Sequence, residues 1–429
     1  MLKLSILVFF FSSTSALAIW DELDWDLAFT TEAMIFDNDK VAETNDEILS
    51  FIPQVTVSYF GDHFMFRLAP RYRFDTFDSN RDMFLLDDSY VGWENDWFAF
   101  KAGALILNFG AMHAFSPMNW INTRVIDSLY SGFSKMGEPA MSFKFRGDNN
   151  ALELVYLPFF TAPYWPDSTS RMGVGINFDK DLVVTSSGAT ENPWRMDQFA
   201  ALYHFSGGKL EAKLGYFRMI DKSFSLIGID AQAQFNRYYY YMDMLAMSAQ
   251  YAMPGFTINA EVYGKNYDNH QAEVIDLNAF PDLEYRNQSP VNHQGISIGA
   301  DIPRAYSFDQ SGVWLLEYQY LFGAPKNLLR LYSVFQNAVL LGYRHSFNNF
   351  ANSEFTTSVA MDLSGRGDRL YLVNYSQNVW NSMKWDLGLR VVETGASSER
   401  GVLNENAFAG LALIDRSDGI YSTLTYYWD

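Results

Sequence analysis

The sequence predicts an all-β protein, a transmembrane antiparallel β-barrel of about eighteen strands with one connection folded inward. The chain opens with an export signal, no later apolar run is long enough for a spanning helix, and short segments alternate apolar with polar residues. Only helices or closed barrels satisfy their backbone hydrogen bonds in hydrocarbon, so any membrane span must be made of strands. The predicted location is therefore the bacterial outer membrane, and about sixteen or twenty strands would also satisfy the even-number rule.

Residues 1–18 have the layout of a secretory signal peptide. A basic residue precedes the apolar run Leu4 to Phe11, and small residues end the segment at Ala16-Leu17-Ala18. The mature chain is predicted to begin at Ile19 and to form a single barrel domain over residues 19–429. The sequence contains no Cys, so disulfides and thiolate metal sites are excluded, and burial and hydrogen bonding must hold the fold together.

The segment Phe64 to Asp75, FMFRLAPRYRFD, is the clearest predicted strand. Alternate positions carry aromatic or aliphatic side chains, and the positions between them include Arg67, Arg71 and Arg73. A period of two is typical of a strand with one apolar and one polar face. In a membrane barrel the apolar face meets lipid and the polar face meets the interior.

Short turns and long connections alternate along the chain. Turns rich in Gly, Asn or Asp join predicted hairpins at 61–62, 94–96, 147–150, 206–208 and 254–255. Between these hairpins lie longer connections, near 38–47, 109–139, 159–196, 220–236 and 267–293. Barrels with both termini in the periplasm have short periplasmic turns and long outer loops. The alternation in this sequence fits that topology. After residue 300 the alternation does not show which connections are periplasmic turns and which are outer loops.

Basic residues on neighbouring predicted strands point into the same lumen, although the whole chain has a formal charge of −19. A lining of one sign concentrates the opposite ion, so such a lumen favours anions. The alternative is that inward-pointing acids neutralise the cations. The predicted pore-lining residues are Arg67, Arg71, Arg73, Lys101, Lys144 and Arg146, and the acids that could neutralise them are Glu153, Glu211, Glu261, Glu317, Asp362 and Asp386.

The connection 109–139 is too apolar to be a simple solvated loop, because it carries several large side chains such as Phe115 and Trp120. We predict that it folds into the barrel as a constriction. Its acidic residues Asp127 and Glu138 would then face the basic wall. Packing over the barrel mouth is the alternative.

One part of the chain resembles a known group of barrels. Gly103 through Asn122, with Phe109-Gly110 and Pro117, followed by Leu152 to Pro158, is similar to the early strands of porin-like outer-membrane barrels related to the alginate-export family. Phe109 stands where related barrels often have Trp. The resemblance implies an eighteen-stranded barrel with a cation-lined pore for an acidic polysaccharide, and it would suggest the six basic residues as lining by type.

The predicted function is a porin-like channel that passes small polar or anionic solutes. The alternatives are an export pore for an acidic polysaccharide and a barrel scaffold for a periplasmic or surface partner. The six His are scattered without the spacing of a hydrolase or metalloprotease motif, so no catalytic residue, metal or cofactor is expected. The acidic charge argues against nucleic acid, which leaves the lipid bilayer and a solute as partners, with a homo-oligomer or periplasmic partner open.

Overall fold

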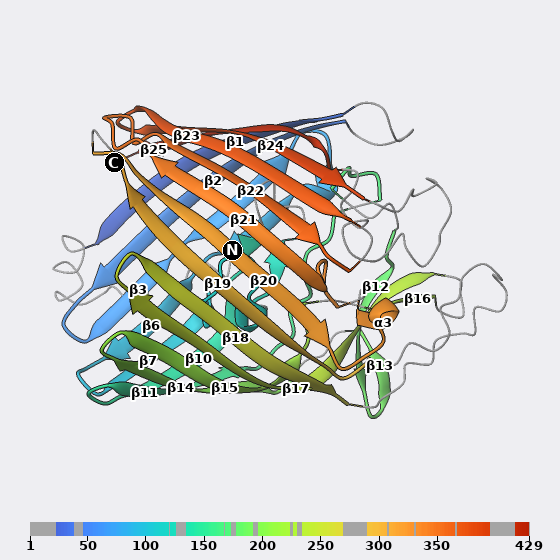
Figure 1. Ribbon diagram of the computed structural model, residues 1–429. Coiled ribbons are helices and arrows are strands. Elements are labelled where there is room, and N and C mark those ends of the chain that lie inside the picture. Colours follow the sequence, from blue (N-terminus) through green and yellow to red (C-terminus); the bar gives the residue numbers. More distant parts are fainter. Residues whose placement is uncertain are drawn as a thin grey trace, which may run out of the picture.

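The computed structural model of this chain is a closed antiparallel barrel of 18 strands (Figure 1). Among the residues described, no helix is long and apolar enough to cross a membrane. The structure describes residues 23–37, 46–119, 121–125, 134–166, 168–172, 177–191, 196–223, 226–229, 234–268, 290–306, 309–329, 332–364, 367–394 and 417–428.

Each barrel strand pairs with its neighbours in the chain, and the first strand pairs with the last, so the sheet has no edge. The predicted number of about eighteen strands is confirmed. The barrel strands are β1 (Asp24–Phe36), β2 (Glu47–Phe60), β3 (Phe64–Leu68) continued by β4 (Pro70–Asp75), β5 (Met83–Leu86) continued by β6 (Ser89–Glu94), β7 (Phe98–Leu105), β10 (Glu138–Arg146), β11 (Asn150–Leu157), β14 (Gln198–Gly207), β15 (Leu210–Ile220), β17 (Phe235–Met253), β18 (Phe256–Tyr267), β19 (His293–Ala305), β20 (Ser311–Phe322), β21 (Asn337–Ser346), β22 (Glu354–Asp362), β23 (Arg369–Trp380), β24 (Met383–Glu393) and β25 (Gly419–Trp428).

Short elements lie between the barrel strands, mostly at one end of the barrel (Figure 1). Three of them form a small mixed sheet with β17, which continues past the barrel wall: β12 pairs parallel with β17, β16 pairs antiparallel with it, and β13 pairs with β12. These elements are η1 (Ser79–Arg81), η2 (Pro117–Asn119), β8 (Arg124–Val125), β9 (Ser134–Lys135), β12 (Lys180–Thr185), β13 (Gly188–Thr190), β16 (Leu226–Ile229) and α3 (Lys326–Leu329).

The segment predicted as one strand from Phe64 to Asp75 is two strands, β3 and β4, which both pair with β2. The break falls at Ala69, whose N–H donates to Ser89 Oγ at 2.9 Å instead of to a ladder partner. Pro70 follows and has no N–H to offer, so the ladder is weakest here. The two faces survive the break, because Arg67 and Arg71 still share the side of Ser58 and Gln54.

Short turns and long connections lie mostly at opposite ends of the barrel (Figure 1), and the exception beyond residue 300 is the short β22–β23 connection, 363–368, at the long-loop end. The β19–β20 and β23–β24 connections are short, whereas β18–β19 and β24–β25 are joined by long segments. The first strand begins and the last strand ends at the short-turn end. In outer-membrane barrels that end is periplasmic. The strand pairing therefore assigns the sides that the sequence left open.

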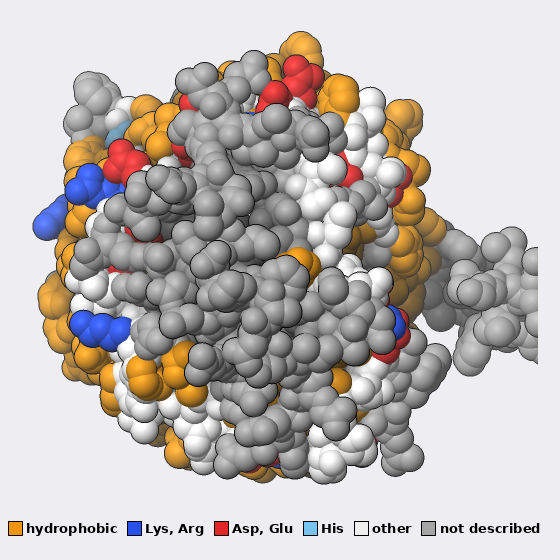
Figure 2. All heavy atoms as spheres, turned by 90° about the vertical axis from the view of Figure 1, so that its right-hand side faces the viewer, with side chains coloured by type: hydrophobic (Ala, Val, Ile, Leu, Met, Phe, Trp, Pro, Cys, Tyr) orange, Lys and Arg blue, Asp and Glu red, His pale blue; other side chains and the backbone are white. Residues whose placement is uncertain are grey.

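The outer face of the wall is apolar. Phe51 and Phe74 are neighbours on β2 and β4 and are about half exposed, as is Leu245 on β17. Viewed from the long-loop end, hydrophobic side chains lie around the rim of the barrel (Figure 2). A closed antiparallel barrel with such an exterior is the architecture of bacterial outer-membrane proteins, and this chain belongs in that membrane.

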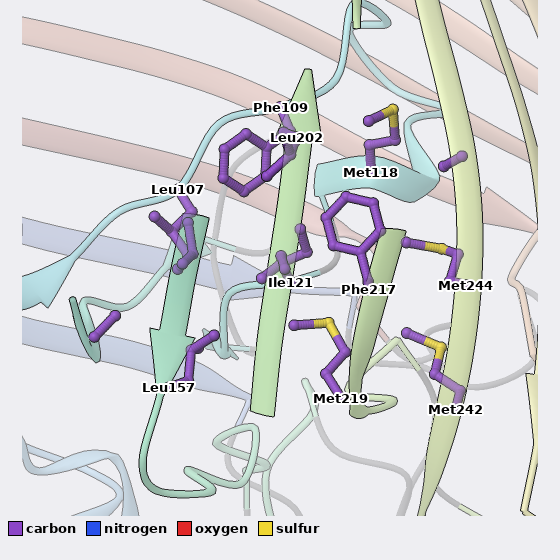
Figure 3. Close-up of a cluster of buried hydrophobic side chains, with 14 of the residues drawn as sticks. Leu107, Phe109, Met118, Ile121, Leu157, Leu202, Phe217, Met219, Met242 and Met244 are labelled. Atoms are coloured by element: carbon purple, nitrogen blue, oxygen red, sulfur yellow. The ribbon is translucent and has the colours of Figure 1, made fainter. Parts of the chain in front are cut away.

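The largest buried cluster lies inside the barrel, where the connection after β7 packs on the wall (Figure 3). Phe109, Met118 and Ile121 come from the connection. They meet Phe217 of β15 and Met244 of β17. The connection therefore folds inward, as predicted, and this part of it does not pack over the mouth.

Candidate pore and its constriction loop

Strand register decides which side chains face the lumen, because directly paired residues point to the same side of a sheet. Lys101 of β7 pairs with Ser142 of β10, and Lys144 of β10 pairs with Glu153 of β11. The alternate positions, such as Phe143, carry the exterior aromatic residues. The parity read from the sequence thus places the predicted basic residues on the inner face.

Three of the six predicted lining residues form ion pairs. Arg71 Nε lies 2.8 Å from Asp87 Oδ2, and Lys144 Nζ lies 4.0 Å from Glu153 Oε2. Arg146, next to a short turn, lies 2.9 Å from Glu94. The two sequence interpretations, a free basic lining and a paired one, therefore each describe part of the wall.

The other three differ in their surroundings. Arg73 is 7% exposed, donates from Nε to the Arg81 carbonyl at 2.8 Å and lies over the Tyr164 ring at 5.7 Å, so it is packed beneath a loop. Lys101 Nζ lies over the Tyr90 ring at 4.3 Å. Arg67 is partly exposed on β3. Lys101 and Arg67 thus remain at the lumen surface, and Arg73 does not.

The sequence reasoning missed Lys213 on β15, although the alternation of Leu210 to Tyr216 places it opposite the lipid-facing Leu214. Its pairing with Ser248 sets it on the inner face, and its Nζ donates to the Phe109 carbonyl at 3.2 Å. We call Arg67, Lys101, Lys144 and Lys213 the basic arc; they lie on strands β3 to β15 along one side of the wall.

Two wall carboxylates hold the inward connection instead of neutralising the arc. Glu261 of β18 accepts the N–H groups of Ala111 at 2.6 Å and Met112 at 2.9 Å, and the Ser116 hydroxyl at 3.0 Å. Gly110 precedes this contact, and a Cβ there would collide with Ser116 Oγ. The sequence turns at this point because only glycine leaves room for the hydroxyl.

Glu317 of β20 continues the same contact. Its Oε1 accepts the His113 N–H at 2.6 Å, and its Oε2 accepts the N–H groups of Ala114 and Phe115, each at 3.0 Å. Five consecutive backbone N–H groups are thus bound by two carboxylates, each 1% exposed. The sequence reasoning placed both acids correctly on the inner face but not in this role.

The constriction loop, residues 106–119 and 121–125, reaches across the lumen. Phe109 packs against Phe217 of β15 with ring centroids 6.3 Å apart. Phe115 packs with Ala338 of β21 and Ala360 of β22. The two contacts lie on well separated strands of the wall. The loop therefore narrows the barrel between them.

His113 is the residue of the constriction loop whose side-chain charge depends on pH. Its Nε2 lies 3.2 Å from Asp301 Oδ2 of β19, and the ring is about half exposed. The hydrogen bond that the His113 ring donates to Asp301 raises the pKa of His113 above its ordinary 6.5, while burial opposes the rise. Glu317 adds to the rise and Arg344 opposes it.

The acids predicted on the connection are placed differently. Glu138 is the first residue of β10, fully buried, and its Oε1 lies 2.6 Å from Lys222 Nζ. The Thr123 N–H of the loop donates to the same oxygen. Glu138 is therefore a structural contact beneath the loop and does not face a pore. Asp127 lies outside the described residues.

A second segment crosses the barrel interior at the long-loop end. We call residues 159–166 and 168–172 the strap. It pairs with the constriction loop through the N–H of Tyr164, which donates to the Arg124 carbonyl at 2.9 Å. Farther along, Arg171 lies 3.0 Å from Asp46 and donates to the Asp37 carbonyl at 2.7 Å. Two crossings thus occupy this end of the lumen.

Many solved structures match this chain, and Wzi and OpdL are two of them. Wzi, described as an outer membrane protein involved in group 1 capsule assembly in Escherichia coli and as a carbohydrate-binding β-barrel, has a TM-score of 0.52 and 8% identity, covering 96% of this chain and 86% of Wzi. OpdL of Pseudomonas aeruginosa has a TM-score of 0.51 and 9% identity, covering 95% of this chain and 99% of OpdL. Protein-family models and curated proteins give no match.

At these identities the likeness shows the fold alone. It agrees with the porin-like barrel that the sequence predicts. Neither of the two structures is described as an alginate exporter, so the resemblance to that family stays a prediction.

Proposed function

We propose that this protein is a porin-like channel that passes small polar or anionic solutes through its basic-lined lumen. The observation that carries the proposal is the basic arc, four cations on one side of the wall. Only Lys144 among them contacts a carboxylate within ion-pair distance in the described residues, and that contact is 4.0 Å long. A partly exposed wall of one sign raises the local concentration of small anions.

A binding function is the second candidate, and the strap favours it. Together with the constriction loop it crosses the long-loop end of the lumen, which would suit a barrel that holds a ligand and does not conduct. The structural likeness to Wzi supports testing a carbohydrate as that ligand. Export of an acidic polysaccharide would use the same basic arc and rests on the sequence resemblance alone.

The test is the reversal potential of the purified protein in planar bilayers under a salt gradient. Substituting Lys101→Ser, Lys144→Ser or Lys213→Ser should each lower the anion preference. Lys209→Ser is the matched control, because it removes the same charge from the exposed turn between β14 and β15. A reversal potential that none of the three arc substitutions changes would refute the anion path. A protein without current that binds acidic oligosaccharides in calorimetry would favour the binding barrel.

A further inference from the structure

We infer that the constriction loop sets the sign of the channel's selectivity by covering two wall carboxylates, Glu261 and Glu317. The inference rests on the proposed channel function and concerns what a permeating ion meets inside it. The loop acts as a cover over an acidic wall, in addition to narrowing the lumen.

Both carboxylates belong to the inner wall. Glu261 pairs with Ser297 and Glu317 pairs with Gly299, so they point inward from β18 and β20 on either side of β19. Asp301 is an inner-face residue of β19 as well. Without the loop, this sector would present carboxylates to the lumen beside the sector that carries Lys213.

The contacts show both carboxylates acting as hydrogen-bond acceptors. Both oxygens of Glu317 accept hydrogen bonds from backbone N–H groups, which cannot act as acceptors. Glu261 also accepts two backbone N–H groups on one oxygen. Backbone donors of this kind stabilise the charged form of a carboxylate. The loop therefore supplies the hydrogen bonds that these two carboxylates would take from water if they were uncovered.

The loop itself adds almost no charge. Residues 108–123, NFGAMHAFSPMNWINT, contain no Asp, Glu, Lys or Arg, and His113 is their single titratable side chain. Covering the acids with this segment replaces a charged surface with a neutral one. A charged loop would have created a new field of its own.

Covering changes the energy of a nearby ion because Coulomb interactions weaken with distance. The loop places a layer of polypeptide between the carboxylates and the lumen and prevents direct contact, since both side chains are 1% exposed. The positive ends of five N–H dipoles also face the carboxylates and oppose their field in the lumen. Lys144 of the basic arc has no such cover, because it keeps 36% of its side chain exposed.

A loop deletion tests the inference directly. Phe109 and Gly110 both donate their N–H groups to Asn119 Oδ1, at 3.2 and 3.1 Å, so residues 110–118 can be replaced by Gly-Gly without stretching the chain. This variant should conduct better than wild type, and its reversal potential should move toward cation preference. Adding Glu261→Gln and Glu317→Gln to the deletion should restore anion preference while the larger conductance remains.

The controls separate the possible failures. Gly110→Leu displaces the loop at full chain length and should shift the selectivity in the same direction, should the deletion fail to assemble. Heat-modifiable mobility on gels verifies that each barrel is folded. A deletion variant with wild-type selectivity, or one that the two Gln substitutions do not reverse, would overturn the inference and leave the channel intact. A wild-type protein that passes no current would overturn both.

Discussion

Charged residues serve two purposes in this barrel, and the contrast lies in their exposure. In the buried pairs at the long-loop end, Lys222 meets Glu138 at 2.6 Å and Lys265 meets Asp221 at 2.8 Å, with side chains 0 to 4% exposed. The basic arc, by contrast, lies on the lumen surface. Asp221 and Lys222 follow β15 directly. Asp221 binds the cation of Lys265, and Lys222 binds the anion of Glu138. Buried charges stabilise the fold through ion pairs, whereas exposed charges can interact with solutes.

Removing one member of a buried pair should have the largest effect. Lys222→Ala leaves the Glu138 carboxylate buried without its cation, and breaking such a pair costs about 3 to 5 kcal/mol. Urea unfolding of the barrel refolded in phospholipid vesicles measures this loss. The double variant Lys222→Met with Glu138→Gln should recover much of it, because no charge is then stranded. Equal destabilisation in the single and double variants would contradict this account.

Titration of His113 should have an intermediate effect, because its ring is about half exposed but bonds a carboxylate, that of Asp301, which is mostly buried. The His113 ring bonds Asp301 on β19, which also accepts a hydrogen bond from Asn259 of β18, and the charges of Glu317 on β20 and Arg344 on β21 act on the ring. Because the Asp301 hydrogen bond raises its pKa, the charged ring holds the loop fully below pH 6.5, and this contribution is lost as the pH rises through the raised pKa.

The anion preference of the channel should therefore be strongest in acid and should fall as His113 loses its proton. His113→Gln should flatten this part of the pH profile of the reversal potential. His204 also faces the lumen, 3.1 Å from Glu153, so His204→Gln is the matched control. A profile that depends on His204 and not on His113 would assign the response to the arc side of the wall.

The smallest effect is expected for the exposed pair at the periplasmic end. Arg146 and Glu94 are 38% and 41% exposed, and pairs of this kind contribute roughly 0 to 1 kcal/mol. Arg146→Ala should leave the urea midpoint nearly unchanged. A loss comparable to that of Lys222→Ala would mean that exposure does not separate the two groups.

Period-two patterning predicted the fold well, because the lipid requires one apolar face on every strand. The same pattern placed Lys101, Lys144 and Glu261 on the inner wall. It could not tell which inward charges meet solvent, because that depends on segments distant in the chain. Arg73 is covered by Tyr164, and Glu317 by a loop some two hundred residues earlier.

The strand break at Ala69 shows the same limit on a local scale. A Pro within an alternating run was visible in the sequence, but the contact that replaces the lost ladder bond comes from Ser89 on a later strand. Lys213 shows the opposite case, since its strand position was readable and it was overlooked. Alternation in the sequence predicts which face of a strand a side chain lies on. The contacts that the side chain makes with distant segments can be seen only in the assembled barrel.

The strap constrains the order in which this protein can be assembled. Met172 packs in a cluster with Met34 of β1, Ile48 of β2 and Tyr421 of β25. β1 and β2 pair with each other near the start of the chain, but β25 joins them only when it pairs with β1. A segment made in the first half of synthesis therefore completes its docking site only when the last strand is in place. Protection of the strap from added protease is accordingly a direct readout of the moment at which the barrel seam closes.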